Sequence, residues 1–305
     1  MFNKIRRFYN QNYKKIIMII LIIIMIIVLI QVANYLAKNG LEKTSKTKST
    51  NSSNTNLQTQ SIISDTTIDE EKAKKNNDII EQFVNFCNKK DIKSAYNILS
   101  DDCKQIIYNN NIDLFTNNYY NLIFTSTKSY TKENWMSTEN MTTYKIQYTN
   151  DILADGKYKK EENFGDYITI IYDNKIPKLN ISKFVTKEEL NKTYEDDNIK
   201  IEIHTVYKYI NSEIYKIKFT NKTDKEIKLY DINDNTKWYL QDENSSKYNV
   251  VESSLQNNLL ILNANGEQDI TVQFNKNYNS KKEVNKMLWE NIKINDKNTS
   301  LEFNF

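Results

Sequence analysis

The chain has only two cysteines, and both lie in the stretch "FVNFCNKKDIKSAYNILSDDCK", residues 83–104. A cysteine pair can be a redox centre, a nucleophile and its partner, a set of metal ligands or a disulfide. Cys87 and Cys103 each fall on the apolar stripe of a predicted short helix, and a further short helix separates them. If the segment is exported, this spacing favours a disulfide, with two buried free thiols as the alternative.

His204 is the only histidine, which removes the usual partner of a catalytic cysteine or serine. It lies in "IKIEIHTVYKY", residues 199–209, where Ile201, Ile203 and Tyr207 are expected on one face of a strand and His204 on the solvent face. Because this strand belongs to the second predicted domain, no Cys-His or Ser-His arrangement can be assembled around the cysteines. Zinc bound through histidines would need a second histidine.

A calcium loop is the remaining motif to weigh. In "DINDNTKWYLQD", Asp231, Asn233, Asn235 and Asp242 occupy positions one, three, five and twelve of an EF-hand loop. Position six, however, is Thr236 where glycine is needed, and the flanks look like strands. The sequence therefore favours a polar turn between two strands, and we predict no catalytic, cofactor-binding or metal-ligating residue.

Charge is unevenly distributed along the chain. Residues 1–50 carry nine Lys or Arg and one acid, a net charge of +8, so the total charge of +3 leaves −5 for residues 51–305. Proteins that bind the phosphate backbone of nucleic acids need a basic surface. The sequence therefore predicts no direct nucleic-acid binding by the folded body.

Residues 16–37 are predicted to form a transmembrane anchor. The run "IIMIILIIIMIIVLI", residues 16–30, is unbroken, and residues 31–37 extend it to the roughly 20 residues that a bilayer-spanning helix needs. A cleaved signal peptide shares the basic start, but this apolar core exceeds the usual ~7–15 residues and no small-x-small cleavage site follows. The lipid bilayer is therefore an expected partner.

The charges that flank this span predict its orientation. Five Lys or Arg and no acid lie in residues 1–15, whereas Glu42 partly offsets the cations after the span. Residues 1–15 are therefore expected to be a cytoplasmic tail, and the body is expected to be extracytoplasmic in a single-pass cell-membrane protein. Residues 38–76 are rich in Ser, Thr, Asn and Lys and are predicted to be a flexible linker.

The first predicted domain, residues 77–185, is expected to contain helices followed by a sheet. Apolar residues recur at helical spacing from Ile79 to Ile123, and Asp91 and Ser100 stand where helix N-caps are expected. The period then changes to two in "TTYKIQYTN" and "GDYITIIYDN", which predicts strands. Helices before a sheet are typical of an α+β fold.

The segment "NNDIIEQFVNFCNKKDIKSAYNILSDDCKQ" resembles the first helices of the cone-shaped α+β superfamily of nuclear transport factor 2, in particular its extracytoplasmic bacterial members. There a short turn leads into an "AY..LS" element before the sheet. The resemblance covers about a third of the chain. The superfamily includes enzymes, scaffold subunits of type IV secretion and conjugation channels, and the stalk domain of some penicillin-binding proteins, so the fold alone does not assign a function.

A cone of this type often has a pocket between its sheet and its helices. The residues that could line one here are Tyr119, Tyr120, Trp135, Tyr144 and Tyr148. Packing in a hydrophobic core explains the same residues, and no carboxylate pair stands out as a general acid and base.

The second predicted domain, residues 198–305, is an all-β sandwich that residues 186–197 join to the first domain. Short alternating segments are separated by Asn, Asp and Ser turns, which suits a chain with four glycines and one proline. The phrases "ILNANGEQDITVQF" and "YKIKFTNKTDKEIKLYD" resemble strand–turn–strand units of bacterial immunoglobulin-like envelope domains. Residues 281–289 are expected to form one or two helical turns.

Together these features predict a non-enzymatic, membrane-anchored scaffold or interaction protein of a bacterial envelope. The superfamily resemblance implies a conjugation or type IV secretion apparatus, with other envelope proteins or further copies of the chain as partners. Two other classes stay open. One is a module that binds wall polymers or a small ligand, and the other is an enzyme that uses the cone pocket.

Overall fold

The computed structural model describes residues 59–64, 66–151, 164–173, 176–255 and 259–305. The predicted tail (1–15), the predicted span (16–37) and most of the predicted linker lie outside these ranges. None of the helices within the described ranges has the length and apolar character needed to cross a membrane. The described chain is a mixed α+β protein whose sheets are mostly antiparallel, as the sequence predicted.

The helices of the first domain lie between residues 70 and 123. They are α2 (Glu70–Asn88), α3 (Ile92–Ile98), α4 (Asp101–Tyr108), α5 (Ile112–Phe115), the π-helical turn η1 (Thr116–Tyr120) and α6 (Asn121–Ile123). The predicted N-caps are confirmed, because the side chains of Asp91 and Ser100 each accept a hydrogen bond from the backbone N–H three residues later. Helix α2 has its own cap at Asp69, so it begins inside the predicted linker.

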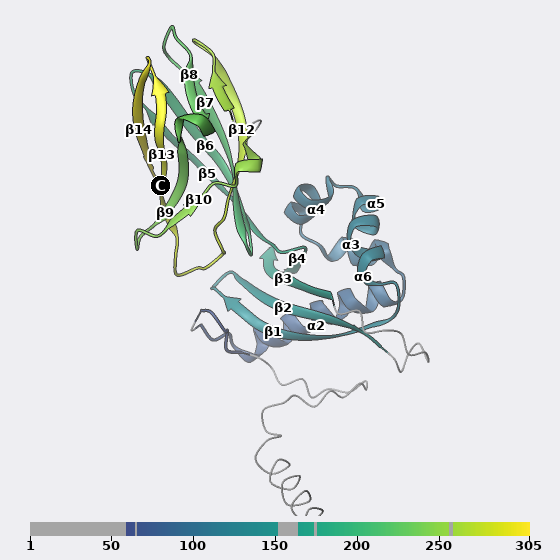
Figure 1. Ribbon diagram of the computed structural model, residues 1–305. Coiled ribbons are helices and arrows are strands. Elements are labelled where there is room, and N and C mark those ends of the chain that lie inside the picture. The colour runs from purple at the N-terminus through teal and green to yellow at the C-terminus, as the bar shows by residue number, and fades with distance from the viewer. Residues whose placement is uncertain (1–58, 65, 152–163, 174–175, 256–258) are drawn as a thin grey trace, which may run out of the picture. The chain divides into compact units, whose positions relative to one another are not determined.

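The sheet of the first domain has the strand order β1-β2-β3-β4, and all its pairs are antiparallel. Its strands are β1 (Lys128–Ser137), β2 (Met141–Asn150), β3 (Phe164–Asp173) and β4 (Ile176–Asn180). Alternate side chains of β2 and β3, among them Ile146 and Ile168, share a core with Ile80 and Phe83 of α2. Figure 1 shows the helices of this domain gathered beside these strands.

The described chain before α2 is attached to the edge of β1. The backbone N–H groups of Ile62 and Ile63 donate to the carbonyl oxygens of Asn134 and Trp135, at 2.9 and 3.0 Å. Ser64 is buried, and its hydroxyl contacts both backbone groups of Ser137. The end of the predicted linker, from residue 59 on, therefore belongs to the folded body.

Strands β5 to β14, which include the predicted second domain, form two antiparallel sheets that share one core. One sheet has the order β12-β7-β6-β5, and the other has the order β10-β9-β13-β8-β11 with β14 paired to β13. The core contains the rings of Phe219, Trp238 and Trp289, which contact one another at centroid distances of 5.9–6.0 Å. The elements are β5 (Phe184–Glu195), β6 (Ile199–Tyr209), β7 (Ser212–Asn221), β8 (Ile227–Asp231), η2 (Ile232–Asp234), β9 (Lys237–Asp242), β10 (Lys247–Asn249), η3 (Glu252–Ser254), β11 (Leu259–Leu262), β12 (Glu267–Phe274), β13 (Val284–Ile294) and β14 (Lys297–Asn304).

Two expectations for this domain were wrong. Most of the predicted joint, residues 186–197, lies in strand β5, which pairs with β6 along its length. The predicted helical turns at 281–289 are largely strand β13, which buries Met287 and Trp289. A short apolar pattern does not by itself distinguish a helix from a strand.

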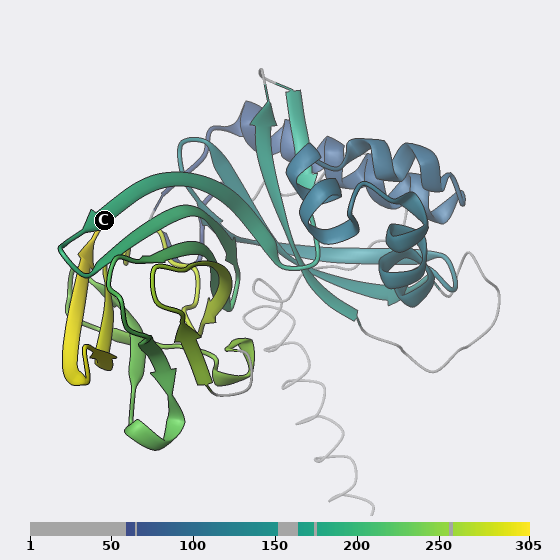
Figure 2. The ribbon, with the colours of Figure 1, turned by 90° about the horizontal axis from the view of Figure 1, so that it is seen from above.

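Strands β5 and β6 are irregular as well as long. Their pairing register shifts near Thr186 and between Glu189 and Lys192, and the pairing of β6 with β7 shifts between Ile203 and Thr205. Each bulge adds a residue on one strand and bends it. Figure 2 shows the resulting curvature of the green-teal strands.

Candidate functional site

Four of the five aromatic residues predicted to line a pocket lie in the core of the first domain. Tyr119, Tyr120, Tyr144 and Tyr148 are each at most 7% exposed and belong to one cluster. Trp135 is only half-buried and lies outside that cluster, with its ring edge-on to Tyr167 at 5.4 Å between centroids. The structure therefore brings together the four tyrosines and separates Trp135 from them.

The polar centre of this core is Asp166, which sequence reasoning missed. The residue is 3% exposed, and its carboxylate accepts four hydrogen bonds. One oxygen accepts from the Tyr119 hydroxyl at 3.0 Å and from the backbone N–H of Ser182 at 3.1 Å. The other accepts from the backbone N–H groups of Tyr167 at 2.7 Å and Lys183 at 3.1 Å.

The environment of Asp166 favours a structural role for this carboxylate. Burial raises its pKa, although the four hydrogen bonds act in the opposite direction. Two of the donors, Ser182 and Lys183, have positive φ angles of 59° and 63°, so the carboxylate holds the turn between β4 and β5. Tyr148 lies behind Tyr119, with 3.3 Å between their hydroxyl oxygens. An inward Asp in the otherwise apolar alternation of "GDYITIIYDN" was the available sequence signal.

A second polar chain joins α2 to the sheet. The amide of Asn76 donates to the Tyr144 hydroxyl at 3.2 Å and accepts from the Tyr172 hydroxyl at 2.7 Å. The ammonium group of Lys132 lies 4.9 Å from the centroid of the Tyr144 ring. Burial lowers the pKa of Lys132 to about 8. This lysine was also absent from the sequence-based candidates.

The predicted disulfide is not formed, and the alternative of two buried thiols describes the structure. Cys87 and Cys103 are free and at most 1% exposed. Burial raises the pKa of both thiols, that of Cys103 to about 12. Because the thiolate is the reactive form, neither residue is set up as a nucleophile.

His204 lies at the bulge of β6 and is half-buried. The bulge reverses the alternation of the strand, so Val206 follows Ile201 and Ile203 into the core of the second domain. The prediction that Tyr207 shares their face was therefore wrong. Tyr207 instead packs against the core of the first domain.

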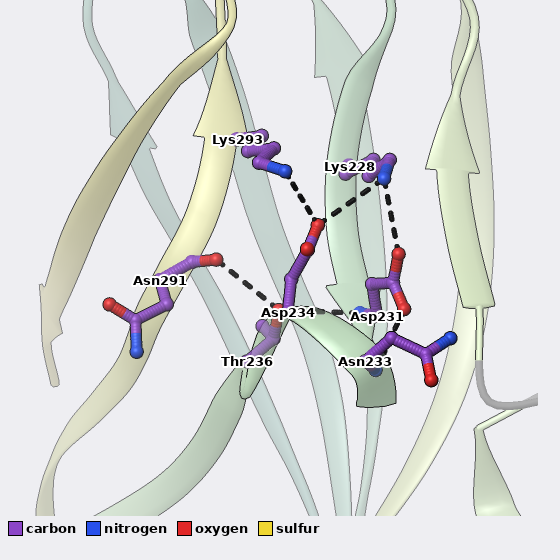
Figure 3. A network of polar contacts seen from close by, with 7 residues as sticks. All are labelled: Lys228, Asp231, Asn233, Asp234, Thr236, Asn291 and Lys293. Carbon is purple, nitrogen blue, oxygen red and sulfur yellow. Dashed lines mark hydrogen bonds and ion pairs between the residues drawn. The ribbon is translucent and has the colours of Figure 1, made fainter.

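Figure 3 shows the polar contacts around the first half of the EF-hand-like stretch, residues 231–236. Residues 231–236 form a turn between β8 and β9, and Asp234 accepts from the ammonium groups of Lys228 at 3.3 Å and Lys293 at 2.8 Å. These two lysines are direct partners across β8 and β13. Like charges directly opposite each other are unfavourable, so Asp234 bridges them.

The two carboxylates at the ligand positions of the calcium motif serve separate turns, because Asp231 lies in the 231–236 turn and Asp242 lies at the next one. The carboxylate of Asp231 accepts from the backbone N–H of Asn233 at 2.9 Å and from Lys228 at 3.1 Å. The carboxylate of Asp242 accepts from backbone N–H groups of the next turn, those of Asn244 and Ser246. In residues 231–234 of the motif, the carboxylates are therefore paired with lysine ammonium groups.

A buried ion pair is the most enclosed charged site in the described part of the second domain. Lys276 and Glu213 have side chains 3% and 1% exposed, with 2.9 Å between nitrogen and oxygen. The Tyr215 hydroxyl donates to the other oxygen of Glu213 at 2.7 Å. The pair fixes the chain after β12 to the start of β7.

Comparisons of the chain with protein-family models, with curated proteins and with solved structures found no match.

Proposed function

We propose that this chain is a non-enzymatic scaffold or interaction protein of a bacterial envelope, held by a membrane span at residues 16–37 with its amino terminus in the cytoplasm and its body outside. The observation that carries the proposal is that the buried carboxylate and the two buried thiols of the described residues have structural surroundings. Asp166 receives four hydrogen bonds, and the two thiols are buried with raised pKa values.

These groups support a binding role because catalysis needs a different arrangement. A general base needs a lone pair that can reach a substrate proton, and a nucleophilic thiol needs a lowered pKa. In this core the carboxylate of Asp166 holds a turn, and the thiols of Cys87 and Cys103 fill apolar space. The candidate residues thus stabilise the fold.

We infer a nuclear-transport-factor-2-like cone in the first domain, supported by helices packed against one face of a four-stranded antiparallel sheet. We infer an immunoglobulin-like sandwich in the second, supported by two antiparallel sheets around one core. Extracytoplasmic domains of these kinds point to a conjugation or type IV secretion apparatus, with other envelope proteins or further copies of the chain as partners.

The proposal is tested in the host cell by separating the anchor from the body. One form keeps residues 1–58 and lacks the body, and another carries the body behind a cleavable signal peptide in place of the span. A scaffold needs both parts in one chain, so each form should fail to support transfer of DNA or protein through the apparatus.

A conservative variant distinguishes a scaffold from an enzyme. Tyr119→Phe removes the hydroxyl that donates a hydrogen bond to Asp166 and keeps the ring in the core. The scaffold proposal expects normal transfer by this variant. Full activity of the released body, or loss of transfer in a folded Tyr119→Phe protein, would instead support an enzyme that uses the first domain.

A further inference from the structure

Lys132 has an unusual position for a lysine. It lies on the helix-facing side of β1, where its ammonium group contacts the face of the Tyr144 ring at 4.9 Å. Among the described residues it has no hydrogen-bond acceptor and no carboxylate partner. Two other lysines of this region differ, because Lys128 donates to Asn150 and Lys72 donates to the carbonyl oxygen of Glu139.

Such an ammonium group is incompletely stabilised. Burial disfavours the charged form of Lys132 and lowers its pKa to about 8. The side chain is half-buried, and the ring face offsets only part of the cost of withdrawing its ammonium group from water. An anion placed beside Lys132 would therefore gain more than one placed beside an exposed lysine.

A second donor without an acceptor lies in the same seam, between α2 and β1. The side-chain nitrogen of Asn77 is buried and has no hydrogen-bond partner, and the residue is 7% exposed. Helix α2 runs along β1, because Asn88 bonds both backbone groups of Lys128 at 2.8 and 2.9 Å. Asn77 precedes Asn88 by eleven residues, which places both on one stripe of the helix.

The other end of α2 lies near the far end of β1, so the helix runs antiparallel to the strand. Lys72 donates to the carbonyl oxygen of Glu139 at 2.8 Å, just beyond the end of β1. Asn77 shares the stripe of Asn88 and lies about 16 Å before it along the helix axis. On β1 this corresponds to about five residues beyond Lys128, which is the middle of the strand, next to Lys132. A buried donor without a partner has a desolvation cost that only an acceptor removes.

We propose that the seam between α2 and β1 binds an oxyanion, a carboxylate or a phosphate group, through the ammonium group of Lys132 and the side-chain amide of Asn77. Tyr144 orients the lysine, and Asn76 holds the Tyr144 hydroxyl in place at 3.2 Å. This site is independent of the proposed scaffold function, since it depends only on contacts within the first domain.

Glu81 is the resident carboxylate that could compete for the site. It is exposed, lies one helical turn after Asn77, and contributes to the raised pKa of Tyr130 on β1. A bound anion would have to approach against its charge. Glu81→Gln should therefore strengthen oxyanion binding, which distinguishes an external ligand from an internal ion pair between Glu81 and Lys132.

The test measures binding of inorganic phosphate and of acetate to the full-length chain in an uncharged detergent, with sodium chloride at matched ionic strength as the control. Thermal unfolding reports binding, and NMR of the lysine side chains reports the pKa of Lys132. We expect saturable stabilisation by at least one of the two anions and a rise of the Lys132 pKa by about one unit or more when it binds. The tighter of the two identifies the ligand chemistry.

Variants of the two donors make the test specific. Lys132→Gln should weaken oxyanion binding at least tenfold, whereas Lys145→Gln, at an exposed lysine of β2, should leave it unchanged. Asn77→Leu should weaken binding several-fold without lowering the stability of the free protein, because it removes a donor that has no partner. Equal thermal stabilisation by chloride and phosphate would overturn the proposal. So would a Lys132 pKa that neither phosphate nor acetate changes and that falls in the Glu81→Gln variant.

Discussion

Replacing Asp166 with Asn should destabilise the first domain strongly, although the two side chains have nearly the same shape. The carboxylate accepts four hydrogen bonds, two at each oxygen. Asn offers one carbonyl oxygen and one amino group, so two donors would face another donor. A buried donor left without an acceptor costs about 1–3 kcal/mol, which gives about 2–6 kcal/mol for the substitution.

The measurement is urea unfolding of the full-length protein, followed by the near-ultraviolet signal of its tyrosines. Asp78→Asn is the matched control, because it makes the same chemical change at an exposed position of α2 and should stay within about 0.5 kcal/mol of the parent. Loss of less than about 1 kcal/mol in Asp166→Asn would contradict the view that this carboxylate is the polar centre of the core.

Three further predictions follow from buried groups. Glu213→Gln or Lys276→Met alone should cost about 3–5 kcal/mol, since each leaves a buried partner unpaired, whereas the double replacement should recover much of that loss in thermal unfolding. Cys87 and Cys103 should both react with a thiol reagent in the unfolded chain and neither in the native one, and a rapidly labelled native thiol would contradict their burial. Because the folded-state pKa of Lys132 is lowered from 10.5 to about 8, stability should rise with pH between these values, and Lys132→Met should remove that rise. An unchanged pH profile in Lys132→Met would refute this assignment.

The regular strands were predictable because their alternation is visible in the sequence. Residues 237–242 and 199–209 were identified as strands with the bounds that β9 and β6 have. Asparagine turns were also foreseen, and Asn109, Asn235 and Asn265 do adopt positive φ angles. Where local sequence and local structure agree, no tertiary information was needed.

The errors arose where tertiary contacts override the local pattern. Strand β5 appeared to be a charged joint because much of its length carries exposed or half-buried polar residues, and its pairing with β6 is a long-range feature. The bulge at His204 places Tyr207 on the face opposite to the one predicted. A bulge adds one residue to a strand, and the alternation of polar and apolar residues in the sequence does not reveal it.

The candidate site was harder to predict than the fold. Four of the tyrosines predicted to line a pocket belong to one core cluster, whereas Asp166 and Lys132 were missed because a lone charged residue in a strand looks solvent-exposed. Their importance depends on burial and on partners far away in the chain, such as Tyr119 and Ser182. The cysteines had suitable spacing for a disulfide, yet spacing along helices does not fix the direction of two side chains.

Protease treatment of intact protoplasts tests the central claim most directly, with one epitope at the amino terminus and another at the carboxyl terminus of the full-length chain. Cleavage between the predicted span and residue 59 should release the body, so the carboxyl-terminal epitope should leave the membrane fraction while the amino-terminal epitope remains protected. Retention of the carboxyl-terminal epitope in intact protoplasts, with release only after lysis, would contradict an extracytoplasmic scaffold.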